Sequence, residues 1–176
     1  MMSRSEISHS TNKIKAAVIT VSDSSHLGKR KDLSGPAVAV ALESNGFEVV
    51  GIQVVPDEIE EIQDAITECC EEASLVVTTG GTGLSERDVT PEATRPLCDR
   101  LIEGIPEQIR RETSKKAPHA ALSRALCGTI GHCLVLNLPG SPNGAVEALQ
   151  SVVSLLPHAL HVLGGKVKQH DEGVAD

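Results

Sequence analysis

The chain has 176 residues, of which 40% are hydrophobic and 23% charged, a composition typical of one soluble globular domain. Its 16 Lys and Arg residues stand against 24 Asp and Glu residues, and the net charge of −8 excludes a general binder of nucleic acid or other polyanions. Phe47 is the single aromatic residue, which excludes binding modes that stack several bases on aromatic side chains. We therefore expect an aliphatic core, no nucleic-acid partner, and phosphate binding only at a local site.

Five cysteines occur without a CxxC pair and without the Cys/His spacing of a metal site. The first 13 residues lack the apolar segment of a signal peptide, and no apolar run approaches the roughly 18 residues of a membrane span. We expect a cytoplasmic protein with free thiols and no membrane partner.

The first half of the chain alternates between strand-like and helix-like segments after a polar, flexible arm at residues 1–13. A β-branched run predicts a strand over 15–21. A helical stretch is expected to open at Ser34, the expected N-cap, and to end at Gly46, the expected C′ residue. A second strand follows at 47–55, and apolar residues at helical spacing predict a helix over 59–73.

The second half begins with a strand at 74–79 that stops at two glycines. Pro91 and Pro106 each suit the first turn of a helix, so helices are expected near 91–102 and 106–116. Segments 122–130 and 133–138 can pair as a hairpin.

A last helix is expected over 143–163, bent near Pro157, and the earlier helix is expected to be bent or interrupted at Pro96. Residues 166–176 are polar and are expected to form a flexible tail. The order of elements predicts a single α/β domain over 14–165: a three-layer sandwich with a mostly parallel central sheet.

Small, acidic and hydroxyl-bearing residues follow four of the predicted strands. Ligands of open α/β sheets bind in the crevice beyond the carboxyl ends of the strands, so we expect these residues to line one site. They are Ser22 and Asp23 after the first strand, Asp57 after the second, Gly80, Gly81, Thr82 and Gly83 after the third, and Pro139, Gly140, Ser141 and Pro142 after the last.

Residues 80–83 contain three glycines in four positions. Glycine tolerates positive φ and lets a ligand reach backbone N–H groups, so the segment can form an anion-binding nest; the alternative is a plain tight turn. The segment lacks the GK pair of a P-loop, and Glu86 stands where the dinucleotide fingerprint GxGxxG requires glycine. Neither of these common phosphate-binding motifs is present.

Asp57 and Asp88 are candidates for a metal site beside this loop. Two carboxylates repel a phosphate unless a cation intervenes, and Mg²⁺ prefers one or two carboxylates together with substrate phosphates. The alternatives are a helix cap for Asp57 and an ion pair with Arg87 or a loop cap for Asp88. Ser141 and Pro142 open the last predicted helix, whose N-terminus either faces a second phosphate or simply follows a turn.

The segment TTGGTGLSERDVTPEAT at 78–94 resembles the molybdenum cofactor biosynthesis proteins of the MogA/MoaB type. Further motifs resemble the family in the family order: TVSD at 20–23, DLSGP at 32–36, PDE at 56–58, LSR at 122–124 and LPGSP at 138–142. The resemblance covers residues 14–163 and implies a three-layer α/β fold that is commonly trimeric. Some MoaB-type members are thought not to adenylate and tend to diverge at the Pro-Asp motif, which this chain keeps.

The resemblance implies a nucleotidyltransferase, with Mg²⁺ as cofactor, that moves AMP from ATP to the terminal phosphate of molybdopterin and releases pyrophosphate. It assigns catalysis and metal binding to Asp57 and Asp88. It implies a homotrimer and contacts with other enzymes of the cofactor pathway. It assigns substrate binding to Ser22, Asp23, Ser34, Gly35, Thr79, Gly80, Gly81, Thr82, Gly83, Arg124, Pro139, Gly140, Ser141 and Pro142.

The implied chemistry needs no Ser–His or Cys–His pair, and none is apparent in the sequence. A phosphate monoester has a second pKa of about 6, so it is already a dianionic nucleophile at neutral pH. The protein has to align the phosphates and neutralise charge, for which Arg87 or Arg124 are further candidates. A non-catalytic molybdopterin carrier or scaffold, and a nucleotide-binding module for another phosphorylated metabolite, are the alternatives.

Overall fold

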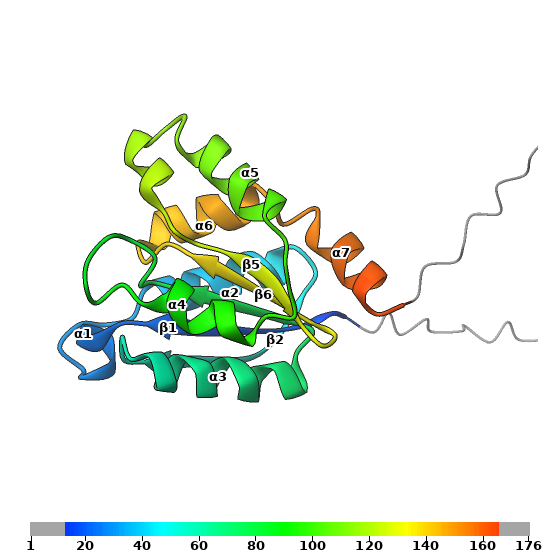
Figure 1. Cartoon of the computed structure of the whole chain (residues 1–176), viewed down its shortest axis with the longest axis horizontal. Coiled ribbons are helices and arrows are strands. Elements are labelled where there is room, and N and C mark those ends of the chain that lie inside the picture. Colours follow the sequence, from blue (N-terminus) through cyan, green and yellow to red (C-terminus); the bar gives the residue numbers. More distant parts are fainter. Residues whose placement is uncertain (1–12, 166–176) are drawn as a thin grey trace, which may run out of the picture.

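Strands and helices alternate along residues 13–165, the part of the chain that the computed structural model describes (Figure 1). The strands are β1 (Lys15–Val21), β2 (Glu48–Val55), β3 (Leu75–Thr79), β4 (Arg100–Leu101), β5 (Cys127–Ile130) and β6 (Cys133–Leu138). The helices are α1 (Asp23–His26), α2 (Ser34–Ser44), α3 (Ile59–Glu72), α4 (Thr90–Thr94), α5 (Gly104–Thr113), α6 (Pro142–Gln150) and α7 (Leu156–Leu163), with short 3₁₀ helices at Arg95–Leu97 and Pro118–Leu122. Apart from Lys13, the predicted arm and tail lie outside the described residues.

The six strands form one sheet in the order β2-β1-β3-β6-β5-β4. β1 pairs in parallel with both β2 and β3, and β3 pairs in parallel with β6. β5 and β6 form the predicted antiparallel hairpin, and β4 adds to the outer edge of β5. The carboxyl ends of β1, β2, β3 and β6 therefore point to the same edge of the sheet, as the sequence predicts.

Alternating side chains of the strands supply two separate cores. Ala16 and Val18 of β1 belong to the core beneath α2, α5, α6 and α7, which also contains Phe47. Ala17 and Ile19 of the same strand belong to the core that α3 and α4 cover. Figure 1 shows α3 on one side of the sheet and α5, α6 and α7 on the other. The predicted three-layer α/β sandwich with a mostly parallel sheet is confirmed.

The prediction of a helix over 91–102 is wrong beyond residue 97. α4 ends at Thr94, a 3₁₀ turn carries Pro96, and the chain continues as β4. Proline has no N–H to continue the helical ladder. The N–H of Asp99 then donates to the carbonyl of Thr129, and the N–H of Ile102 donates to the carbonyl of Cys127, each at 2.8 Å. Residues 99–102 therefore pair with the edge of β5 and do not continue as a helix.

The helix predicted over 143–163 is two helices, α6 and α7, because Pro157 starts a new helix in its first turn instead of bending an old one. The strand predicted over 122–130 begins only at Cys127, since the residues up to Leu122 form a 3₁₀ helix. Ser34 is not the N-cap of α2: its own N–H and that of Gly35 donate to the carboxylate of Asp32, at 3.0 and 3.1 Å.

No helix among residues 13–165 has the length and apolar character that a membrane crossing requires.

Candidate active site

The carboxyl ends of β1, β2, β3 and β6 meet around a pocket of about 340 Å³. Its walls come from six segments: the end of β1 with α1, the chain leading into α2, the turn after β2, the glycine loop after β3, the loop before α4, and the start of α6. Ten of the predicted site residues line it: Ser22, Ser34, Asp57, Thr79, Gly80, Gly81, Asp88, Gly140, Ser141 and Pro142.

The glycine loop at residues 80–83 follows the end of β3, and its first two residues line the pocket. Gly80 and Gly81 have φ values of 108° and 63°, a region that favours glycine. A Cβ on Gly80 would lie 2.2 Å from the carbonyl oxygen of Val21, and one on Gly140 would lie 3.2 Å from the Cα of Gly80. Three backbone segments therefore approach so closely here that side chains do not fit.

The carbonyl groups of the glycine loop form hydrogen bonds within the protein, whereas most of its N–H groups do not. The carbonyls of Gly80 and Gly81 accept from the hydroxyl and the N–H of Thr90, and those of Thr82 and Gly83 accept from the N–H and Nε of Arg124. Within residues 13–165, the N–H groups of residues 81, 82 and 83 donate no hydrogen bond. Because its carbonyls are bonded to Thr90 and Arg124 while these N–H groups remain available, the loop is suitable for binding an anion.

Asp57 and Asp88 reach this loop from different segments. A Cβ on Gly81 would lie 3.3 Å from Oδ1 of Asp57, and one on Gly83 would lie 2.9 Å from Oδ2 of Asp88. Both aspartates therefore lie on the same side of the molecule, although 31 positions separate them in the sequence (88 − 57). Oδ2 of Asp88 accepts the N–H of Ser85 at 2.8 Å, so Asp88 also closes its own loop.

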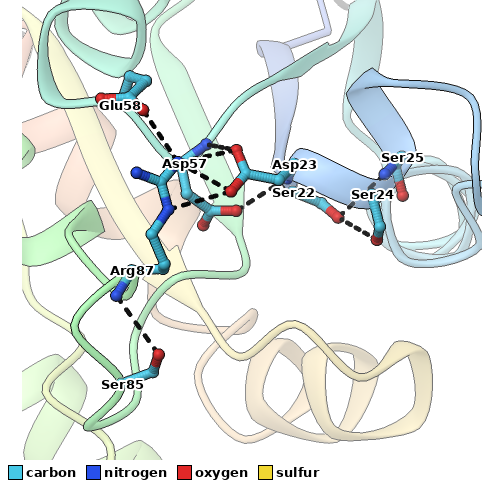
Figure 2. A network of polar contacts seen from close by, with 8 residues as sticks. All are labelled: Ser22, Asp23, Ser24, Ser25, Asp57, Glu58, Ser85 and Arg87. Atoms are coloured by element: carbon cyan, nitrogen blue, oxygen red, sulfur yellow. Dashed lines mark hydrogen bonds and ion pairs between the residues drawn. The ribbon is translucent and has the colours of Figure 1, made fainter.

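Asp57 is held by a reciprocal pair of backbone contacts with Asp23 (Figure 2). The N–H of Asp23 donates to Oδ2 of Asp57 at 2.8 Å, and the N–H of Asp57 donates to Oδ1 of Asp23 at 3.0 Å. Burial raises the pKa of Asp57, and the charges of Asp23 and Asp88 raise it further. The pKa of Asp23 is lowered, chiefly by the N–H of Asp57 and then by Arg87.

The donor set of this site fits a hard divalent cation. Among the described residues, Oδ1 of Asp57 and Oδ1 of Asp88 accept no hydrogen bond, so each carboxylate keeps one oxygen available. Burial is the main cause of the raised pKa of Asp57, and a cation there would offset the added repulsion from Asp23 and Asp88. No group of three or more His, Cys, Asp or Glu side chains suited to a metal occurs within residues 13–165, and two carboxylates plus substrate phosphates are the pattern that Mg²⁺ favours.

A second pocket of about 620 Å³ adjoins the first. The two pockets share Gly81, Asp88, Gly140 and Ser141. Thr82, Gly83 and Pro139, which do not line the first pocket, line the second. Much of the remaining wall is apolar and comes from the loop after β3, from α5, from α6 and from the chain before β5: Leu84, Ile109, Ala117, Ala120, Leu122 and Ala148. Two ligands could therefore meet at the shared residues.

Three of the predicted substrate-binding residues line neither pocket. The carboxylate of Asp23 pairs with Arg87 and the N–H of Asp57. Gly35 packs where a Cβ would meet Asp32 and Thr20 at 2.5 Å. The guanidinium of Arg124 donates to the carbonyls of Gly83 and Asp88 and pairs with Glu92.

Arg87 and Arg124, the predicted cations, thus contact protein groups, and the pocket draws its positive charge from elsewhere. Arg30 and Lys31 line the first pocket and form no ion pair with the described residues. Sequence reasoning missed them because they lie in a polar stretch with no periodic pattern. Their position directly before the DLSGP motif was the available signal.

Comparison with known proteins identifies the family of this chain. A family model described as a probable molybdopterin binding domain matches residues 17–158. The molybdopterin adenylyltransferase of Helicobacter pylori (strain J99) is 36% identical over 164 residues, which are 90% of this chain and 93% of that protein. The molybdenum cofactor synthesis protein cinnamon of Drosophila melanogaster is 41% identical over 158 residues, 88% of this chain but only 26% of that protein.

Solved structures give the same result. The molybdopterin biosynthesis enzyme MoaB of Thermus thermophilus superposes with a TM-score of 0.82 at 43% identity, covering 86% of this chain and 97% of that one. The tungsten cofactor synthesizing protein MoaB of Pyrococcus furiosus superposes with a TM-score of 0.80 at 36% identity, covering 86% and 98%. The chain belongs to the molybdopterin-binding family of molybdenum cofactor biosynthesis proteins of the MogA/MoaB type.

Proposed function

We propose that this protein is a Mg²⁺-dependent molybdopterin adenylyltransferase. It would transfer AMP from ATP to the terminal phosphate of molybdopterin, giving adenylyl-molybdopterin and pyrophosphate. The observation that carries the proposal is the pair of aspartates, Asp57 and Asp88, that lie beside a glycine loop whose amides at 81–83 remain available. The named activity of the Helicobacter relative supports it.

The two adjoining pockets support a reaction between two phosphorylated ligands. An oxygen of the molybdopterin phosphate would attack the α-phosphorus of ATP, a new P–O bond would form, and the bond to the pyrophosphate oxygen would break. The nucleophile carries its charge at neutral pH, so no side chain has to remove a proton. The residues that the pockets share, Gly81, Asp88, Gly140 and Ser141, lie where such phosphates would meet.

The chain's own contribution is alignment and electrostatics. The amides of residues 81–83 would bind phosphate oxygens, and Arg30 and Lys31 would balance the charge of the triphosphate. Asp57 and Asp88 would hold Mg²⁺, which when bound neutralises charge on the phosphates. Ser141 caps α6 by accepting the N–H of Gly144 at 3.2 Å, which fixes the backbone that borders both pockets.

Purified protein incubated with Mg²⁺, ATP and molybdopterin tests the proposal. We expect adenylyl-molybdopterin and pyrophosphate to form in equal amounts, and no ATP to be consumed without the pterin. Asp57→Asn and Asp88→Asn should each lower kcat by on the order of 100-fold with smaller effects on KM, because the lost interactions act mainly in the transition state. Asp64→Asn, the same charge change on the exposed face of α3, is the matched control.

Two results would contradict the proposal. Unchanged turnover of Asp57→Asn and Asp88→Asn would remove the role assigned to the aspartates. Tight molybdopterin binding by the parent protein without any adenylyl product would identify a carrier or scaffold instead.

We also propose a homotrimer in the reducing cytoplasm, which works with other enzymes of the pathway. The family resemblance supports the trimer, and the five free thiols are consistent with a reducing compartment. Light scattering coupled to size-exclusion chromatography should give three times the chain mass of 18.5 kDa, and a monomer would contradict the proposal.

A further inference from the structure

Arg87 connects three segments next to Asp57 (Figure 2). Its Nε donates to Oδ2 of Asp23 at 3.0 Å, and its Nη2 donates to both oxygens of the same carboxylate at 3.0 and 2.8 Å. Nη2 also contacts Oε1 of Glu58 at 2.9 Å. Asp23 follows β1, Glu58 precedes α3, and Arg87 lies in the loop that carries Asp88, so one guanidinium spans all three.

The contact continues from Asp23 to Asp57. The carboxylate of Asp23 that pairs with Arg87 also accepts the N–H of Asp57, and the carboxylate of Asp57 accepts the N–H of Asp23. A chain of contacts therefore runs from Arg87 through Asp23 to Asp57. Arg87 is the direct neighbour of Asp88 in the sequence.

Arg124 anchors the same loop through carbonyl groups of its backbone. Its Nε donates to the carbonyl of Gly83 at 2.7 Å, and its Nη2 donates to the carbonyl of Asp88. Arg124 therefore holds the loop to the body of the protein, whereas Arg87 holds it to the turn that carries Asp57.

We propose that Arg87 and Asp23 are positioning residues that set the placement of Asp88 relative to Asp57, and so the geometry of the shared cation site. The inference rests on the proposed function for its kinetic consequence and not for its structural one. Arg87 lines neither of the two pockets, and both oxygens of Asp23 already accept hydrogen bonds. Direct contact of either side chain with substrate is the alternative.

The ion pair between Arg87 and Asp23 is exposed, so a positioning role can be distinguished from a role in folding stability. The side chains of Arg87 and Asp23 are 54% and 40% exposed, and exposed ion pairs add little to folding stability. Loss of the pair should therefore leave the unfolding temperature nearly unchanged while it releases the loop.

Steady-state kinetics of AMP transfer form the first arm of the test. Arg87→Ala and Asp23→Asn should each lower kcat by about tenfold at unchanged KM for ATP, since small displacements of reacting groups cost rate and not binding. Arg87→Lys keeps the positive charge but lacks the planar guanidinium that donates twice to one carboxylate, so it should recover part of the lost kcat. The double variant should be no slower than the slower single variant, because both changes break the same contact.

Lys115→Ala is the control, since it breaks a comparably exposed ion pair, with Glu112, that lies in neither pocket. Its kcat should match the parent. A rise in KM for Arg87→Ala with kcat unchanged would overturn the proposal in favour of substrate contact. Parent kinetics in Asp23→Asn would overturn it as well.

Amide hydrogen exchange of the ligand-free protein is the second arm and does not depend on activity. Arg87→Ala should speed exchange at residues 84–88, and Asp23→Ala should also speed it at the amide of Asp57, which loses its acceptor. Unchanged exchange in both variants would overturn the proposal. If the parent protein transfers no AMP, the proposed function fails, and this measurement still decides whether Arg87 and Asp23 position the loop.

Discussion

Replacing Gly80 with alanine should destabilise the protein more than any ordinary turn substitution. The φ of 108° at Gly80 is a conformation that L-residues rarely adopt, and such strain costs about 1–3 kcal/mol. The added Cβ would lie 2.2 Å from the carbonyl oxygen of Val21, so the ends of β1 and β3 would have to separate. Overpacking of this kind costs about a further 1–3 kcal/mol.

The free energy of unfolding of Gly80→Ala should therefore fall by about 4 kcal/mol, which at a urea m-value of about 2 kcal/mol/M moves the midpoint by about 2 M. Gly104→Ala is the matched control, because its Cβ would meet nothing within 4 Å at the start of α5. That variant should unfold within about 1 kcal/mol of the parent protein.

Urea unfolding followed by far-UV circular dichroism measures both variants, since the chain has no Trp or Tyr for fluorescence. An equal midpoint for Gly80→Ala and Gly104→Ala would show that the ends of β1 and β3 leave room for a Cβ at Gly80.

Three further predictions concern buried polar groups and thiols. Burial raises the pKa of Asp57, so without divalent cations the stability of the parent falls as pH rises through the window between the ordinary Asp pKa of about 4 and the raised one. Asp57→Asn should thus unfold at higher urea than the parent at pH 7 and lose this advantage near pH 3; an advantage that grows on acidification would refute the assignment. Asn137 is fully buried and donates to the hydroxyls of Thr78 and Thr94 at 2.9 and 3.1 Å. Asn137→Ala should lower the free energy of unfolding by about 2–4 kcal/mol in the same urea assay, and a loss under about 1 kcal/mol would contradict the network. Burial raises the pKa of Cys127 to about 12; iodoacetamide at pH 8 should label it only after unfolding in urea, as peptide mass spectrometry can check, and rapid labelling of the folded protein would argue against its burial.

The sequence predicts the site wherever local signals and one topological rule suffice. Runs of β-branched residues mark β1 and β3, glycines mark the loop at residues 80–83, and parallel strands bring their carboxyl ends together. Asp57 and Asp88 reach one pocket for that reason. The predictions of long helices are wrong at Pro96, where a 3₁₀ turn and a strand follow α4, and at Pro157, where a new helix starts. Periodicity alone does not distinguish these arrangements from a bent helix.

The role of Asp23 could not be read from the sequence. A polar residue at a strand end is typical of a ligand contact, and the partner that occupies its carboxylate, Arg87, lies 64 positions away. Arg124 is similar, since its acceptors are carbonyls of a loop 36 to 41 positions earlier. Such contacts depend on how loops fold against each other and leave no periodic pattern in the chain.

The proposed function requires that Asp57 and Asp88 together hold one divalent cation beside the glycine loop. A crystal structure with Mg²⁺ and a non-hydrolysable ATP analogue would show whether they do. We predict one metal ion that contacts an oxygen of each aspartate and the nucleotide phosphates, next to residues 80–83. An ion bound by the phosphates alone, with both aspartates turned away from it, would show that the aspartates do not bind the metal.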